Sequence, residues 1–334
     1  MLSIKKKCLL FLTVLVLMSL GQTTYASSRS WKSWLIEQYF WLKGDKSYYK
    51  PQDDVDFKKY LDESQAETDK GYSLTNNDVY GQLKSESLEG MQVYSWNDHH
   101  NPKQKTIFYL HGGSYLNNPT SYHISMLKEL SQTLDAKIVF PIYPKTPRNT
   151  YYTVMPKVVN VYRHFHQQNQ ENFFLMGDSA GGGLALGLGH ALNYEAKPYT
   201  LLQPKRIILL SPWLDVTMSH PEIKDYEKTD PILSAWGLKR VGEYWARSKD
   251  LMTHEYVSPK NGRTDHLAPI SLFTGTREIF YPDIRDYAKL LKERNHDVTY
   301  YEKAGMNHVY PIYPISEANE AKEQIRQEII KSST

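Results

Sequence analysis

The sequence has only one cysteine, Cys8, among its 334 residues. One cysteine excludes an internal disulfide and a metal site built from several thiolates. The sequence also lacks a clear surplus of charge, because 40 Lys and Arg residues stand against 37 Asp and Glu residues. Without a basic surplus, we expect no nucleic-acid partner.

A long apolar span near the N-terminus is lacking too. The apolar stretch from Cys8 to Leu20 has 13 residues, whereas a membrane span needs about 20. Three lysines precede it, and polar residues lead to Ala26, which is typical of a secretory signal. We therefore predict a signal peptide at residues 1–26, cleavage near Ala26, a secreted or cell-surface protein, and no stable membrane insertion after cleavage. An uncleaved N-terminal anchor is the alternative.

Residues 27–80 show a helical pattern of apolar side chains. Trp31, Trp34, Leu35, Tyr39 and Leu42 recur at helical spacing. We interpret this stripe as packing, and no clear membrane-surface helix stands out in the sequence.

From residue 81 onward, short apolar runs alternate with longer amphipathic ones, which predicts strands and helices in turn. Continuous apolar strands separated by helices are typical of a mostly parallel sheet covered on both faces, so the predicted fold class is α/β. The predicted strands are 91–96, 106–110, 137–140, 172–176, 206–210, 269–274 and 298–303. The stretch at about 215–267 has no convincing strand and is too long for an ordinary connection. We expect it to be a cap inserted into the core domain, residues 81–334.

One serine lies at a predicted junction of strand and helix. The run Gly177-Asp178-Ser179-Ala180-Gly181 follows the predicted strand 172–176 and precedes a helix. This is the G-x-S-x-G pattern in the structural context that a nucleophile elbow requires. The sequence therefore predicts Ser179 as a catalytic nucleophile.

A serine nucleophile needs a base, and the base needs an acid to orient it. His308 follows the last predicted strand, and its place in the chain fits the order serine, acid, histidine. Glu278 lies in the loop after strand 269–274, whereas Asp283 begins the next predicted helix, where a carboxylate also favours the helix start. We predict Glu278 as the acid and keep Asp283 as the alternative.

An oxyanion site is predicted in a second glycine-containing loop. His111-Gly112-Gly113-Ser114 follows strand 106–110, and its glycines let backbone N–H groups approach a substrate. We expect the N–H groups of Gly112, Gly113 and Ala180 to bind the developing charge, and His111 to hold the loop. We expect no metal site, because no cluster of Cys, His or acidic residues has ligand spacing.

With these motifs in place, the chain resembles the hormone-sensitive-lipase-like esterases of the α/β-hydrolase superfamily. The resemblance rests on "LHGGSY", "GDSAGGGLAL", "LLSPWLD", "FTGTREIFYPD" and "GMNHVYP". It implies an eight-stranded sheet flanked by helices, and a helical cap made by residues 27–80 and the insertion at 215–267. It also implies hydrolysis of carboxylic esters without a cofactor. Two positions depart from the family pattern: Ser114 replaces a glycine, and Glu278 replaces the usual aspartate.

The leading functional prediction is a serine carboxylesterase that hydrolyses short-chain acyl or acetyl esters of small molecules through an acyl-enzyme. Amide or formamide hydrolysis by the same residues is one alternative. A non-catalytic binding protein with a hydrolase fold is another, and a homodimer is left open.

Overall fold

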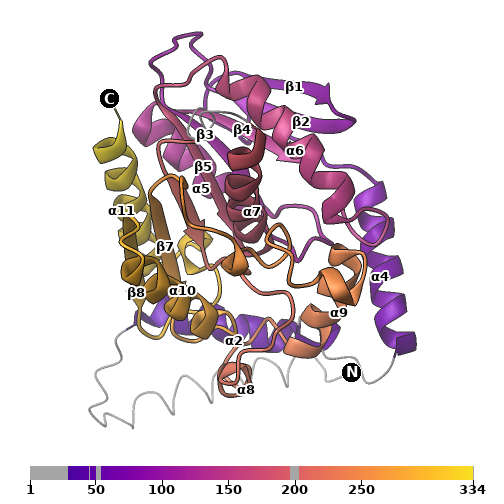
Figure 1. Ribbon diagram of the computed structural model, residues 1–334. Coiled ribbons are helices and arrows are strands. Elements are labelled where there is room, and N and C mark those ends of the chain that lie inside the picture. The colour runs from indigo at the N-terminus through magenta and orange to yellow at the C-terminus, as the bar shows by residue number, and fades with distance from the viewer. Residues whose placement is uncertain (1–28, 45, 50–53, 196–202, 334) are drawn as a thin grey trace, which may run out of the picture.

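The computed structural model describes residues 29–44, 46–49, 54–195 and 203–333. The predicted signal peptide at residues 1–26 lies outside them. The described residues form a central sheet between two layers of helices, with further helices across one edge (Figure 1).

The sheet has eight strands in the order β1-β2-β4-β3-β5-β6-β7-β8. Strands β3 to β8 pair in parallel, whereas β1 pairs with β2, and β2 with β4, in antiparallel fashion. The strand bounds are β1 Leu83–Leu88, β2 Met91–Trp96, β3 Thr106–Leu110, β4 Lys137–Ile142, β5 Phe173–Asp178, β6 Ile207–Leu210, β7 Ile270–Gly275 and β8 Val298–Lys303. The predicted α/β class and mostly parallel sheet are therefore confirmed.

Two hydrophobic clusters cover the two faces of the sheet. Alternate residues of a strand point to opposite faces, so Phe108 and Leu110 join one cluster while Ile107 and Tyr109 join the other. The first cluster includes residues of α6 (Tyr151–His166), α7 (Ser179–Glu195) and α10 (Tyr281–Glu293). The second includes residues of α5 (Ser121–Leu134) and α11 (Ser316–Ser332).

Strand β1 was missed in the sequence. Its residues, LKSESL, are mostly polar, and all six are exposed or partly exposed. It lies at the edge of the sheet and pairs only with β2. An edge strand that packs little apolar surface shows no alternation of apolar and polar residues in its sequence. β1 forms because it pairs with β2 in a hairpin.

The N-terminal segment and the insertion contain helices. The first contributes α2 (Trp31–Lys43), α3 (Lys46–Tyr49) and α4 (Asp54–Asp69). Residues 215–267 contain α8 (Ile223–Tyr226), α9 (Ala235–Ala246) and two short 3-10 turns, Lys249–Leu251 and Pro259–Asn261. In Figure 1, α2 runs across the bottom of the view, on the same side as α8 and α9. Within the described parts of the chain, we find no helix with the length and apolar character to span a bilayer.

Candidate active site

The nucleophile elbow joins the end of β5 to the start of α7. Ser179 is the first residue of α7 and has a φ of 51°, in the left-handed region. Such a sharp turn brings α7 against the neighbouring strand β3. A Cβ atom on Gly181 would lie 2.1 Å from the Leu110 carbonyl oxygen, so only glycine allows this approach.

Ser179, His308 and Glu278 meet at this elbow. The Ser179 Oγ lies 2.8 Å from the His308 Nε2, and the His308 Nδ1 lies 2.6 Å from the Glu278 Oε2. All three residues are buried, and Glu278 is fully inaccessible to solvent. The structure therefore brings together the serine, base and acid that the sequence proposed, although they are up to 129 positions apart.

Glu278 is held by a set of short hydrogen bonds. Its Oε1 accepts from the Ser211 hydroxyl at 2.7 Å, from the Thr274 hydroxyl at 2.7 Å, and from the Gly275 N–H at 2.9 Å. Ser211 Oγ also accepts from the Val309 N–H at 3.0 Å, next to His308. These bonds fix the carboxylate, so its second oxygen faces the imidazole.

Asp283, the alternative acid, lies in a different cluster. Its carboxylate pairs with the Lys260 ammonium at 2.8 Å, and the same ammonium pairs with Asp215 at 2.7 Å. Asp283 lies in the first turn of α10. His308 therefore pairs with Glu278, whereas Asp283 pairs with Lys260 of the inserted segment.

The imidazole of His308 is tuned by opposing effects. Burial by itself would lower the pKa of His308, because it disfavours the charged ring. The hydrogen bond and negative charge of Glu278 outweigh burial, with smaller help from Asp230 and Asp178, so the pKa of His308 lies above its ordinary value. A proton taken from Ser179 would therefore be held well by this base.

The predicted oxyanion loop differs from the expectation at Gly112. The Gly112 N–H donates to the Asp178 Oδ1 at 2.8 Å, so this group is committed inside the protein rather than free for substrate. Gly113 has a φ of 119°, and the following Ser114 has a φ of 55°. The serine at the family's glycine position is therefore left-handed, a conformation that costs a non-glycine residue about 1–2 kcal/mol.

Sequence analysis missed the role of Asp178, which ties the oxyanion loop to the elbow. Besides Gly112, its carboxylate accepts from the Tyr109 hydroxyl at 2.7 Å and lies 3.1 Å from the His123 Nε2. Burial raises the pKa of Asp178, but His123 and these hydrogen bonds outweigh burial and lower it. An acidic residue inside a buried elbow was the available signal, because a buried carboxylate needs partners.

Two more residues that support the acid were also missed. Ser211 directly follows β6, and its hydroxyl links Glu278 to the histidine loop. Asp230, in the inserted segment, is fully buried and accepts the Ile279 N–H at 3.0 Å, one residue after Glu278. Burial raises the pKa of Asp230. No local pattern distinguishes Asp230 from other acids of the insertion.

His111 is the first residue of the predicted oxyanion loop. Its ring is buried and stacks on Tyr143 with centroids 4.6 Å apart, and its Nδ1–H donates to the Gly112 carbonyl at 2.6 Å. The structure therefore gives His111 a packing position in this loop.

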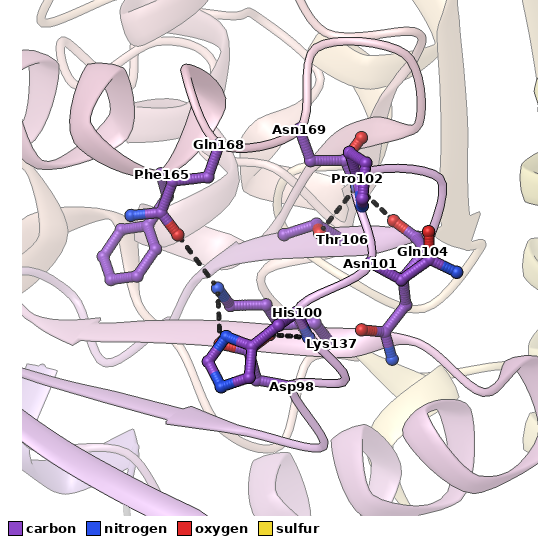
Figure 2. Close-up of a pocket in the computed structure, with 10 residues that line it drawn as sticks. All are labelled: Asp98, His100, Asn101, Pro102, Gln104, Thr106, Lys137, Phe165, Gln168 and Asn169. Atoms are coloured by element: carbon purple, nitrogen blue, oxygen red, sulfur yellow. Dashed lines mark hydrogen bonds and ion pairs between the residues drawn. The ribbon is translucent and has the colours of Figure 1, made fainter.

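A separate cavity of about 230 Å³ lies at the other edge of the sheet (Figure 2). Thr106 and Lys137, the first residues of β3 and β4, line it. Lys137 points toward Asp98 and Gln168, with its ammonium 3.1 Å and 3.3 Å from their oxygens. These polar groups pair with one another, and Ser179, His308 and Glu278 do not line the cavity. Among the residues the structure describes, no group of three or more His, Cys, Asp or Glu side chains is placed to hold a metal ion.

Residues 107–312, more than half of the chain, match the family model described as the alpha/beta hydrolase fold. The chain belongs to this family. A curated α/β-hydrolase relative, an esterase of Acinetobacter venetianus, is 25% identical over 202 residues, which are 60% of this chain and 65% of the relative. An acetyl-hydrolase of Streptomyces hygroscopicus is 26% identical over 211 residues, 63% of this chain and 69% of the relative. The matches thus span about two thirds of these relatives.

Solved α/β-hydrolase structures cover more of the fold. A candidate esterase from Staphylococcus aureus is 28% identical, with a TM-score of 0.79 over 87% of this chain and 97% of that chain. An esterase of the bacterial hormone-sensitive lipase family shares the fold at a TM-score of 0.73 and 21% identity, over 91% and 99%. The α/β-hydrolase family is therefore confirmed, and the chain shares its fold with a hormone-sensitive-lipase-family esterase.

Proposed function

We propose that this protein is a serine carboxylesterase that acts on short-chain acyl or acetyl esters of small molecules. The observation that carries the proposal is the buried chain of hydrogen bonds from Glu278 through His308 to Ser179, at 2.6 Å and 2.8 Å. A neutral imidazole so placed can accept the serine proton as the hydroxyl attacks a carbonyl. The names of the esterase and acetyl-hydrolase relatives support the ester as the reactive group.

In the proposed first step, the Ser179 Oγ forms a bond to the ester carbonyl carbon and its proton passes to the His308 Nε2. The carbonyl oxygen becomes an oxyanion, for which we propose the N–H groups of Gly113 and Ala180 as donors. Ala180 is the second residue of α7, and N–H groups in the first turn of a helix have no partner within it. One such donor contributes about 10²–10³ in turnover.

In the second step, His308 gives the proton to the leaving alcohol as the C–O bond breaks, leaving an acyl group on Ser179. Water then gives a proton to His308 as its oxygen bonds to the acyl carbonyl carbon. His308 returns that proton to the Ser179 Oγ as the acyl C–O bond breaks, which frees the carboxylic acid product and restores the serine hydroxyl. Glu278 stays charged and stabilises the imidazolium in both steps. The proposal requires no cofactor.

The proposal is tested with Ser179→Ala. We expect hydrolysis of p-nitrophenyl acetate and butyrate to fall by about 10⁴–10⁶, because serine removal leaves only the oxyanion donors and binding. Thermal unfolding should show a folded variant. Wild-type turnover by Ser179→Ala would contradict the proposal, and faster hydrolysis of N-formyl aromatic amines than of esters would favour the amide reaction.

The compartment is a separate proposal. The lysines and apolar residues of 1–26 support export with cleavage near Ala26. N-terminal sequencing of protein secreted by an expressing bacterium tests it, since a mature chain that still begins at Met1 would contradict cleavage.

A further inference from the structure

Helix α2 exposes a row of large apolar side chains. Leu42 is 87% exposed, Trp31 68%, Tyr39 52% and Leu35 41%. Their spacings of four, four and three residues place them on one side of the helix, which we call the outer face of α2. Trp41, 40% exposed, lies beside it. The sequence suggested that this stripe packs inside the protein, and for these four residues that expectation is wrong.

The opposite side of α2 is fixed to the body of the protein. Glu37 is buried and pairs with Arg277, whose two nitrogens lie 2.8 Å and 3.2 Å from its oxygens, and also with Arg29. Phe40 packs against Tyr313 with ring centroids 5.2 Å apart. The ion pairs of Glu37 and the ring contact of Phe40 thus lie on the side of α2 that faces the protein. The helix is held so that its apolar outer face points away from the protein.

The charges on α2 complement an anionic surface. Lys32 and Lys43 are exposed, whereas the only acidic residue of the helix, Glu37, is buried. Tryptophan and tyrosine favour the boundary between lipid headgroups and acyl chains, and nearby lysines attract anionic headgroups.

From this composition and exposure, we propose that the outer face of α2 docks on the surface of an anionic lipid bilayer. The helix would lie in the interface without crossing the membrane, with its outer face toward the lipid and its opposite side packed on the protein. This inference does not depend on the proposed esterase activity.

Docking would orient the edge of the sheet that carries Ser179 and His308. Arg277, the inward partner of Glu37, directly precedes Glu278, and Ser33 of α2 lies 3.5 Å from the sulfur of Met306, two residues before His308. The loops that carry the acid and the histidine therefore lie directly behind α2. A bilayer on the outer face would be on the same side of the protein as these loops.

Vesicle binding by the chain from residue 27 onward, the product of the proposed cleavage, provides the first test. Sedimentation is measured with vesicles of phosphatidylglycerol and phosphatidylcholine, using Leu35→Glu/Leu42→Glu. We expect affinity to fall at least about tenfold, because two carboxylates would enter the interface. The matched control, Tyr152→Glu/Ile330→Glu, changes two exposed side chains on α6 and α11 and should bind like wild type. Equal loss in both double variants would overturn the proposal.

A second measurement, made on the same chain, reports α2 directly. Phosphatidylglycerol with bromine near the headgroup should quench tryptophan fluorescence in wild type, and Trp31→Phe/Trp41→Phe should remove most of that quenching while binding persists. Trp236→Phe, on α9 and 38% exposed, is the control. Quenching that is absent, or unchanged in Trp31→Phe/Trp41→Phe, would overturn the proposal.

A second copy of the chain is the competing occupant. Sedimentation velocity without lipid should show the same oligomeric state for wild type and Leu35→Glu/Leu42→Glu. A dimer that the double substitution breaks would assign the face to self-association and overturn lipid docking. Hydrolysis of soluble p-nitrophenyl butyrate should be equal in both, which separates this outcome from a failure of the proposed function.

Discussion

The parallel strands begin at one edge of the sheet, the amino edge, and end at the other, the carboxyl edge. The two edges differ in which residue types adopt a left-handed backbone with positive φ. At the amino edge, three such residues are Asn97, His100 and Asp135, of which His100 lines the cavity of Figure 2. Asparagine, aspartate and histidine are the non-glycine types enriched in this conformation. At the carboxyl edge, the left-handed residues around the elbow and the histidine loop include Ser114, Tyr115, Ser179, Ser211 and Val309.

Serine, tyrosine and above all β-branched valine adopt this conformation at greater cost. Backbone strain is therefore concentrated where Ser179 and His308 meet, while the amino edge uses residues suited to its turns. Strain of this kind persists only when surrounding structure fixes it. The comparison indicates that the carboxyl edge accepts backbone strain around Ser179 and His308, whereas the amino edge forms its turns with less strain.

Among the variants that test this comparison, Glu278→Gln should reduce turnover most. We expect turnover of p-nitrophenyl butyrate to fall by about 10²–10⁴, because the amide cannot stabilise the imidazolium. The matched variant Asp283→Asn removes a charge from the Lys260 cluster and should reduce stability with less than a tenfold effect on turnover. The opposite ranking of the two variants would assign the acid to Asp283.

Gly112→Ala tests the close approach at the carboxyl edge. The new Cβ would lie 2.3 Å from the Asp178 Oδ2 and 3.0 Å from the Ser179 Cβ. Either the loop or the elbow must shift, and a displacement of this size costs about 10² in turnover. Gly90→Ala is the control for turnover, because its Cβ would meet only the end of Lys157 at 3.8 Å, and the strain at its φ of 71° should reduce stability rather than turnover. Steady-state kinetics of both variants decide the outcome, and equal turnover would contradict the prediction.

The pH profile sharpens the comparison with a smaller effect. In the proposed mechanism His308 accepts the serine proton only when its ring is neutral, so kcat/KM should fall as pH drops through the pKa of His308. Because Glu278 raises the pKa of His308 despite burial, the acidic midpoint should lie above the ordinary value of about 6.5. In Glu278→Gln the midpoint should move to lower pH. An unchanged midpoint would show that Glu278 does not tune the base.

The smallest effect on activity is expected from Asn169→Ala at the amino edge. Asn169 is buried and donates to the Thr106 hydroxyl at 3.1 Å and to the Gln104 carbonyl. Leaving these acceptors unpaired should reduce the free energy of unfolding by about 1–3 kcal/mol. Denaturant unfolding measures that loss, and kcat/KM should stay at the wild-type value. A large loss of activity without loss of stability would erase the difference between the two edges.

Local sequence was a good guide where the signal is short-range. Apolar runs predicted seven strands, and the glycine pattern around Ser179 predicted the elbow, because both depend on neighbouring residues. The polar edge strand β1 had no such signal. The stripe in α2 gave the correct helix but the wrong environment, since periodicity shows that apolar residues share a side and does not show what covers that side.

The sequence by itself determined the α/β class, the family, and the short set of residues from which a serine nucleophile, its base and its acid could be chosen. Only the tertiary structure decided that Glu278 faces His308 while Asp283 pairs with Lys260, and that the Gly112 N–H belongs to Asp178. It also decided that the outer face of α2 is exposed rather than packed inside the protein. The reason is physical: each choice depends on distances and burial among segments far apart in the chain, which no local pattern encodes.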